Sequence, residues 1–426
     1  CDDGNAEPWD GCTSKCEIAE FRVPNSYKSS QARPALAALG GTRWVGVWTS
    51  NAPDATGDPT QGDAGRKVFS RVFSNGLVPE TSEAIVNTSA EGANPDYPAV
   101  AGAPDGRFLA AWQSEFPATT VHQVRARARH YSASGPSDGE FDLEGATGNY
   151  TTSTRSPSVG AFGDGQTVAA WVSGSLVLPD SIRARVVATD GKGGPLVNVA
   201  SNSVLAYSAP AVAAGTRSGV NQFVVAYVAP DVQGATDVLL KVWTNGVLSN
   251  EHVVNVTKAG AQDSPAVAMS ADGSQAVVVW LGPATSTDKT RVVWGRRLTL
   301  PMSWVDAADV RLSSGSQESF APRAAFLAGT PSRFVIGWPR FRGAFLDSVD
   351  AMFRRFTFAG GTGPAPLDAT DVIANVFEDG DQTPVALTGV RGDGSFLLGW
   401  ASPFQDGDML GVFAAHFFAE GNQASP

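Results

Sequence analysis

The stretch Thr383–Trp400, TPVALTGVRGDGSFLLGW, contains the unit from which the fold can be predicted. Pro384 opens a run of small and apolar residues, Asp393-Gly394 follows, and a second apolar run ends at Trp400. An Asp-Gly pair between two apolar runs is a strong signal of a β-hairpin, because both turn residues adopt positive φ. The stretch therefore predicts two antiparallel strands joined by a tight turn.

The same landmarks recur along the whole chain. The proline appears in seven copies, at Pro34, Pro98, Pro157, Pro210, Pro265, Pro322 and Pro384. The aromatic residue that closes the second apolar run keeps the same rhythm, at Trp48, Trp112, Trp171, Tyr227, Trp280, Trp338 and Trp400. The turn between them is Asp-Gly in four copies and Gly40-Gly41 in the first. A unit repeated in this way predicts one repeat architecture and not several unrelated domains.

Each copy continues with a third predicted strand that carries a basic residue at one fixed place. These residues are Arg71, Arg129, Arg185, Lys241, Arg296, Arg354 and His416. Several copies end with a fourth, weaker strand, an apolar pair followed by Asn, as in Ile85-Val86-Asn87. Four short strands per unit are typical of a β-propeller blade.

The two ends of the chain predict how the ring closes. The last copy stops after its third strand, at residues 412–418, and residues 20–25 resemble the fourth strand at residues 83–87. A strand from the N-terminal segment can therefore complete the last blade and leave no open sheet edge. We expect an all-β, seven-bladed β-propeller over residues 17–426. Its blades start near residues 34, 98, 157, 210, 265, 322 and 384, and residues 17–27 complete the last blade.

Composition narrows the function. The 46 Gly, 27 Pro and 17% charged residues fit many turns and short strands. A formal net charge of -11 argues against nucleic acid as a partner, because phosphate binding needs a basic surface. No apolar run reaches the roughly 18 residues of a transmembrane helix.

The three cysteines, Cys1, Cys12 and Cys16, lie within the first 16 residues. Such clustering predicts a small disulfide-stapled module and an extracellular setting. The stretch CDDGNAEPWDGCTSKC resembles the end of a cysteine-rich repeat of secreted and surface proteins of myxobacteria and related bacteria. That family has a further upstream Cys, so residues 1–16 are interpreted as a repeat remnant with one unpaired Cys. The alternative is that Cys1 is the lipid-bearing residue of a bacterial lipoprotein.

Blade seven resembles a repeat of large secreted bacterial adhesins and calcium-rich surface proteins, P-A-V-A followed by D-G, F-V-V-x-W and Q-D-G. The resemblance implies a secreted or cell-surface protein that binds a protein or a glycan. No G-x-S-x-G or H-E-x-x-H motif occurs, and the four histidines are scattered among different blades. We therefore expect a noncatalytic binding or structural protein. The alternative is a polysaccharide hydrolase that uses loop carboxylates above the propeller channel.

Candidate site residues fall into three groups. The recurring aromatic and basic residues are expected to be structural, between blades, although a sugar-stacking role and an anion-binding ring are the alternatives. Calcium is the one cofactor considered, with Asp2, Asp3, Asn5 and Asp10 as oxygen ligands. Ligand recognition is assigned to the loop face, at Asp54, Asp58, Asp63, Arg340, Phe341, Arg342, Asp406 and Asp408.

Overall fold

The structure is a computed structural model, and it confirms the seven-bladed, all-β propeller. It describes residues 20–25, 29–51, 66–74, 77–88, 93–116, 123–137, 139–145, 153–175, 180–202, 207–231, 234–343 and 348–421. The predicted disulfide module and the calcium ligands proposed at its start lie outside these residues, as do Asp54, Asp58 and Asp63. Among the described residues, no helix has the length and apolar character needed to span a bilayer.

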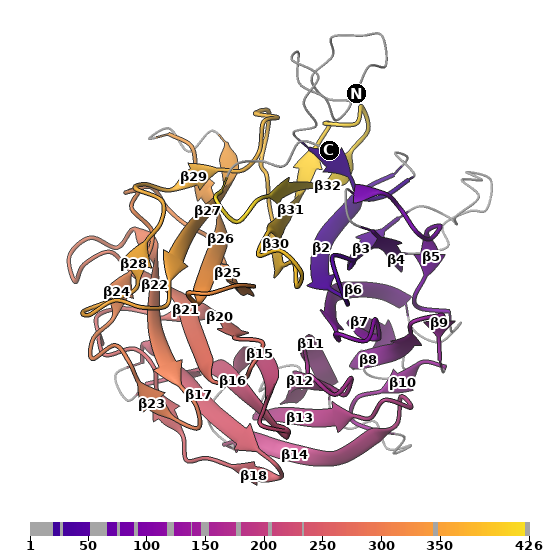
Figure 1. Cartoon of the computed structure of the whole chain (residues 1–426), viewed down its shortest axis with the longest axis horizontal. Coiled ribbons are helices and arrows are strands. Elements are labelled where there is room, and N and C mark those ends of the chain that lie inside the picture. The colour runs from indigo at the N-terminus through magenta and orange to yellow at the C-terminus, as the bar shows by residue number, and fades with distance from the viewer. Residues whose placement is uncertain are drawn as a thin grey trace.

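Seven antiparallel sheets surround a common axis, and we number them as blades 1 to 7 in chain order (Figure 1). Their innermost strands are β2 (Gln31–Ala38), β6 (Ala93–Gly102), β11 (Ser153–Ala161), β15 (Ser208–Arg217), β20 (Asp263–Met269), β25 (Arg323–Leu327) and β30 (Val385–Gly389). The second strands are β3 (Trp44–Ser50), β7 (Phe108–Phe116), β12 (Thr167–Gly174), β16 (Val220–Pro230), β21 (Gln275–Pro283), β26 (Arg333–Phe341) and β31 (Phe396–Pro403).

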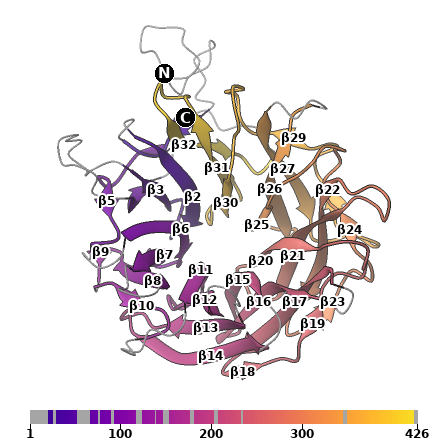
Figure 2. The ribbon, with the colours of Figure 1, turned by 180° about the vertical axis from the view of Figure 1, so that it is seen from behind.

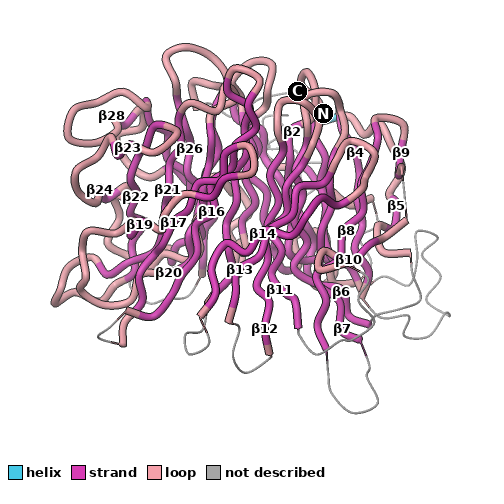
Figure 3. The backbone as a smooth tube through the Cα atoms, turned by 90° about the horizontal axis from the view of Figure 1, so that it is seen from below, coloured by secondary structure: helices cyan, strands magenta, loops and turns pink. Residues whose placement is uncertain are grey.

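The third strands are β4 (Lys67–Phe73), β8 (Gln123–Ser132), β13 (Ser181–Val187), β17 (Thr236–Thr244), β22 (Arg291–Thr299), β27 (Val349–Thr357) and β32 (Leu410–Phe417). Outside them lie β5 (Ala84–Ile85), β9 (Gly135–Pro136), β10 (Phe141–Asp142), β14 (Gly193–Ser201), β18 (Val247–Leu248), β19 (His252–Val253), β23 (Ser303–Trp304), β24 (Val310–Arg311), β28 (Ala365–Pro366), β29 (Val372–Ile373) and β1 (Phe21–Arg22). In Figure 3 the strands cross the molecule between two opposite faces, where the loops gather.

The N-terminal strand closes the ring as the sequence predicts. Strand β1 pairs antiparallel with β32, with Phe21 opposite Ala414 and Arg22 opposite Phe413. The Val23 N–H extends this ladder by donating to the Val412 carbonyl at 3.0 Å. Blade 7 therefore combines both ends of the chain, and Figure 2 shows it beside β2 and β3 of blade 1.

In blades 1 to 5 the repeated proline lies at a β-bulge in the innermost strand. In blade 1 the register of β2 on β3 shifts between Ala32 and Ala35, and Arg33, just before Pro34, has a φ of 53°. Blades 2, 3 and 5 repeat this arrangement, with positive φ at the residue before the proline. Proline suits a bulge because its missing N–H breaks no ladder bond there.

The recurring aromatics fill the space between blades. Trp112 of blade 2 is fully buried and packs in one cluster with Val45, Val47 and Val68 of blade 1. The equivalent aromatic in every other blade is also at most 1% exposed. Burial of the whole ring leaves no indole face for a sugar at these positions, so their role in the structure is packing.

Candidate functional site

A groove of about 440 Å³ lies between two loops of blades 6 and 7. One loop follows β29 and contributes Phe377, Asp379 and Gly380, and the other joins β31 to β32. The second loop contributes Pro403, Phe404, Gln405 and Gly407. Concave surfaces that combine aromatic and polar groups on propeller loops are typical ligand sites.

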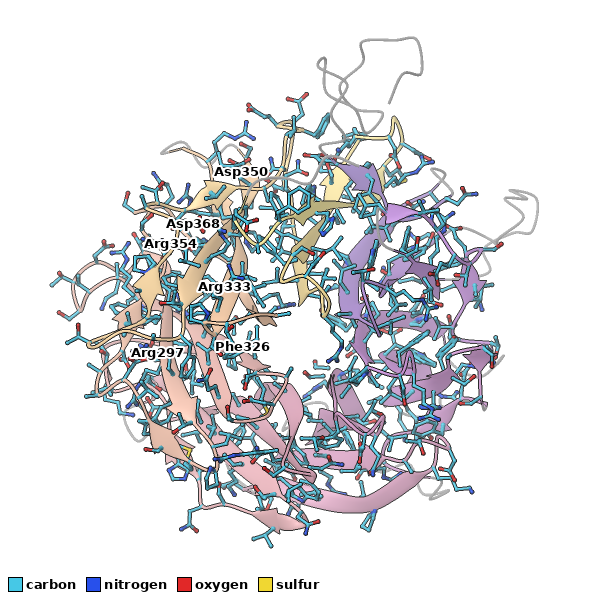
Figure 4. All side chains as sticks on the ribbon, in the orientation of Figure 1. Arg297, Phe326, Arg333, Asp350, Arg354 and Asp368 are labelled. Atoms are coloured by element: carbon cyan, nitrogen blue, oxygen red, sulfur yellow. The ribbon has the colours of Figure 1, made fainter. Side chains whose placement is uncertain are left out.

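A buried network centred on Asp350 of β27 holds the first loop (Figure 4). Arg342 forms a bidentate ion pair with Asp350, with Nη2 at 2.6 Å from Oδ1 and Nε at 3.0 Å from Oδ2. Asn375 donates from Nδ2 to the same carboxylate at 3.0 Å and accepts the Ala351 N–H at 2.8 Å. Arg342 also binds Glu378 at 2.8 Å, so this cation positions the loop and is not directed at a ligand.

The second loop presents an aromatic ring to solvent. Phe404 is 72% exposed and has a φ of 59°, in the left-handed region. It is held by two turn hydrogen bonds, from its own N–H to the Met409 carbonyl at 2.8 Å and from the Gly407 N–H to its carbonyl at 3.1 Å. A non-glycine residue in this region costs about 1–3 kcal/mol, and such strain clusters at functional sites. The turn thus keeps a hydrophobic ring where packing alone would not place it.

Glu20 lies beneath both loops and connects them to the closing strand. Its carboxylate accepts the backbone N–H groups of Val376 and Phe377, the second at 3.0 Å, and the side-chain amide of Gln405. Burial is the main cause that raises the pKa of Glu20, and these three hydrogen bonds oppose it. The strand that closes the ring therefore also fixes both walls of the groove.

Glu20 belongs to a repeated contact that the sequence analysis did not identify. An acidic residue at the start of the outer strand accepts backbone N–H groups from the end of the preceding blade. Glu83 binds the Asn25 N–H, Glu140 binds that of Thr88, Asp309 binds those of Val256 and Thr257, and Asp371 binds those of Ser314 and Gly315. We call this contact the carboxylate latch. Its sequence signal is an acid directly before the first residue of the short outer strand.

The predicted loop-face residues of blade 7 lie beside the groove but do not line it. Asp408 accepts the Ser29 N–H at 2.9 Å and so fixes the segment before β2. The side chain of Asp406 is 6% exposed and lies 4.0 Å from Arg22. Burial raises the pKa of Asp406, and one of its carboxylate oxygens, Oδ2, has no hydrogen-bond partner.

The predicted loop-face residues of blade 6 make other contacts. Arg340 forms an ion pair with Asp371 at 2.6 Å, next to the carboxylate latch between blades 5 and 6. Phe341 packs edge-on against Phe320, with ring centroids 5.1 Å apart. The structure therefore brings Arg342 close to the groove but uses Arg340 and Phe341 between blades 5 and 6.

The repeated basic residues join neighbouring blades through backbone carbonyls. Each of six cations donates to a carbonyl near the end of the preceding outer strand, and four of these bonds run from Arg71 to Val23, Arg129 to Val86, Lys241 to Val199 and Arg354 to Leu312. Arg185 and Arg296 do the same with Glu144 and Val254. His416 differs, because its Nε2 lies 2.8 Å from Ser395 Oγ and burial lowers its pKa. This arrangement supplies no ring of cations facing a central anion.

Metal binding finds no support in the described part of the chain, where no group of three or more His, Cys, Asp or Glu side chains could hold an ion. The four calcium-ligand candidates near the N-terminus, three Asp and one Asn, remain a prediction, because they lie outside the described residues.

Blade 5 provides an internal comparison for the groove. The loop that leads into its innermost strand β20, residues 255–262, aligns with residues 375–382, and Pro283 aligns with Pro403. Both loops keep a glycine with positive φ against that proline and a glutamine that donates to the loop backbone. However, Thr257, Ala259 and Ala284 stand where the groove has Phe377, Asp379 and Phe404. Alignment of the repeats could have found these substitutions in the sequence.

No protein-family model matches the chain, and no curated protein matches it either. Solved structures do resemble it. The GH93 α-L-arabinofuranosidase of Fusarium graminearum has a TM-score of 0.50 and 12% identity, with 77% of this chain and 95% of that one covered. The BP39L lectin from Burkholderia pseudomallei has a TM-score of 0.49 and 16% identity, with 94% and 99% covered. An α-L-arabinanase of Penicillium chrysogenum has 0.47 and 16%, with 75% and 92% covered.

Because all identities are low, these likenesses concern the propeller fold alone. They also correct one expectation, that the protein is not an enzyme. The GH93 α-L-arabinofuranosidase, at a TM-score of 0.50, is a glycoside hydrolase, so this fold gives no ground for excluding enzyme activity. The expectation was wrong because it rested on missing local motifs and on scattered histidines. Loop carboxylates from different blades leave neither signal.

Proposed function

We propose that this protein acts on glycans and holds a sugar chain in the groove between blades 6 and 7. The observation that carries the proposal is Phe404, an aromatic ring 72% exposed on a strained turn at the edge of a 440 Å³ groove. Aromatic faces pack on the apolar faces of sugar rings. Asp379 and Gln405 add oxygen acceptors for hydroxyl groups in the same groove.

Loss of the Phe404 ring should therefore weaken binding. In titrations with a panel of soluble oligosaccharides, we expect Phe404→Ala to reduce affinity about tenfold or more, as for an aromatic hot spot. The matched control is Phe418→Ala, which removes a 43% exposed ring after the opposite end of β32. Equal affinity of the two variants for every bound sugar would refute the groove as the site.

Hydrolysis of the bound glycan is a second candidate, favoured by the two kinds of carboxyl group at this site. Asp379 is exposed in the groove and suits a carboxylate role. Burial raises the pKa of Asp406, as a general acid requires, but its carboxyl group lies beside the groove and must turn into it to reach a bound glycan. Release of new reducing ends from the bound polysaccharide tests this candidate. Asp406→Asn should abolish product release and preserve binding, whereas product release unchanged by this substitution would exclude Asp406 as the acid.

An extracellular or cell-surface location belongs to the same proposal. It is supported by the acidic composition, the cysteine cluster and the resemblance to secreted bacterial repeats. Polymeric glycans are found mainly in that compartment, so location and proposed ligand agree.

A further inference from the structure

The loops around the groove are acidic. The described residues on these loops and in the contacts that hold them include seven carboxyl groups, those of Glu20, Asp350, Glu378, Asp379, Asp381, Asp406 and Asp408. Two guanidinium groups oppose them, those of Arg22 and Arg342. Arg342 is paired with both Asp350 and Glu378. Of the seven, Asp379, Asp381 and Asp408 form no ion pair with a described residue, so the excess of negative charge is local.

Two of these carboxylates face solvent without an ion pair. Asp379 and Asp381 are exposed on the loop after β29, and neither forms a salt bridge with any described residue. The equivalent positions in blade 5 are Ala259 and Ala261, and Lys258 stands where this loop has Glu378. The charge is therefore a property of this groove and not of the repeat.

A buried acceptor in the groove provides an independent observation. Gln405 lines the groove, is only 4% exposed, and its Oε1 has no hydrogen-bond partner. Its amide nitrogen is already used by Glu20, so the atom left without a partner is an acceptor. An unsatisfied buried acceptor costs about 1–3 kcal/mol until a donor reaches it. The side-chain groups of Asp379 and Gln405 that are free in the groove thus accept hydrogen bonds.

Phe404 completes a set of groups that suits a cation. The face of an aromatic ring attracts an ammonium group, and the attraction adds to that of a nearby carboxylate. An anionic sugar would meet Asp379 and Asp381 without a compensating arginine. A neutral sugar would use the ring and the acceptors but not the charge.

We infer that the groove selects glycans with free amino groups, that is, amino sugars that are not N-acetylated. The inference rests on the proposed glycan function and specifies its ligand class. The ammonium group binds between the Phe404 ring and Asp379, and the hydroxyl groups donate to Gln405 Oε1 and to Asp379. An N-acetyl group removes the charge and places a bulky amide at the same point.

The test compares four hexasaccharides by calorimetric titration at low salt: a glucosamine oligomer, its N-acetylated form, a glucose oligomer and a galacturonate oligomer. We expect the glucosamine oligomer to bind about tenfold more tightly than the two neutral ones, and the galacturonate oligomer to bind least. The difference should shrink toward 1 M salt, where the Debye length is about 3 Å.

Variants separate charge from stacking. Asp379→Asn should remove most of the preference for the amine without changing the affinity for neutral sugars, whereas Phe404→Ala should weaken both. The matched control is Asp190→Asn, which removes one negative charge from the exposed β13–β14 turn of blade 3. Equal shifts in Asp379→Asn and Asp190→Asn would mean that only net charge matters, and this would overturn the inference.

The outcomes distinguish the inference from the proposed function. Equal binding of the amine and N-acetyl forms would overturn the inference and leave the glycan function in place. Absence of binding by all four sugars would refute the proposed function. A hexalysine peptide that binds as tightly as the glucosamine oligomer would show that the groove recognises a polycation and not a sugar.

Discussion

Replacement of Arg297 by methionine tests how neighbouring blades are joined. Arg297 of β22 and Asp306 form an ion pair whose side chains are 0% and 1% exposed. The guanidinium group also donates to the Phe358 carbonyl of blade 6 and, at 3.3 Å, to the Gly360 carbonyl. Arg297→Met leaves the Asp306 carboxylate and a carbonyl group buried without their main donor. We expect the free energy of unfolding to fall by about 3–5 kcal/mol, the cost of an uncompensated buried charge.

Two other ion pairs in the chain give reference values for this loss of stability. The Arg355–Asp368 pair makes the same connection from blade 6 to the Ala419 carbonyl of blade 7, with side chains 7% and 10% exposed. The Arg107–Asp105 pair is 36% and 39% exposed, so Arg107→Met should cost about 0–1 kcal/mol. Figure 4 shows Arg297 and Asp368 on the same side of the ring. Arg355→Met is expected to lie between the other two substitutions.

Urea unfolding followed by the fluorescence of the buried tryptophans measures the order of the three variants. Urea is uncharged and does not screen the ion pairs. The double variant Arg297→Met/Asp306→Leu should recover much of the loss, because it removes the charge left without a partner. If Arg297→Met unfolds at the same urea concentration as Arg107→Met, or if the double variant is no more stable than the single one, the reasoning is refuted.

Three further predictions concern pH, ring closure and metal. Burial lowers the pKa of His416, so as the pH falls the unfolded chain binds a proton at this histidine before the folded chain does. Stability should therefore fall as the pH drops below about 6.5, the ordinary pKa of histidine. In a series of melting curves, His416→Gln should reduce that fall. A wild-type slope retained in the variant would contradict this. Glu20→Ala removes the acceptor of two backbone N–H groups. It should lower the free energy of unfolding in urea by about 1–3 kcal/mol and also weaken glycan affinity. A loss of stability alone would show that the groove does not depend on the closing strand. Chelation of calcium should lower the melting temperature if the acidic N-terminal residues hold an ion, and an unchanged value would exclude a stabilising site.

The framework was predictable from the sequence because each repeated residue has one packing role in every blade. Pro34 and its equivalents occupy the bulge or the start of the innermost strand, and Trp112 and its equivalents fill the space between blades. Closure of the ring by residues 20–25 was predictable for the same reason. This segment has an acid and apolar residues at the positions where residues 83–87 have them. A pattern that is copied seven times carries enough signal to be found without an alignment of homologues.

The groove was not predictable in the same way, because it depends on features that occur once. Phe404 is exposed only because its turn adopts positive φ, and no apolar periodicity indicates this. The other wall comes from a loop about 25 residues earlier in the chain, which meets the turn only after the blades assemble. Asp406 and Asp408 were selected for their charge, yet one is buried and the other binds a backbone N–H.

The comparison of blades 5 and 7 indicates where function is encoded in such a protein. Both blades keep the glycine, glutamine and proline that fix the shape of the paired loops. Five positions change character. Thr257, Lys258, Ala259, Ala261 and Ala284 of blade 5 correspond to two aromatic residues and three acids on the loops of the groove, Phe377, Glu378, Asp379, Asp381 and Phe404. The loop before β20 keeps the same glycine and glutamine contacts without an aromatic residue or an acid at these positions, so Phe377 and Asp379 are not needed to hold the fold. Differences between repeats at positions with no structural requirement are therefore the part of this sequence that carries information about the ligand.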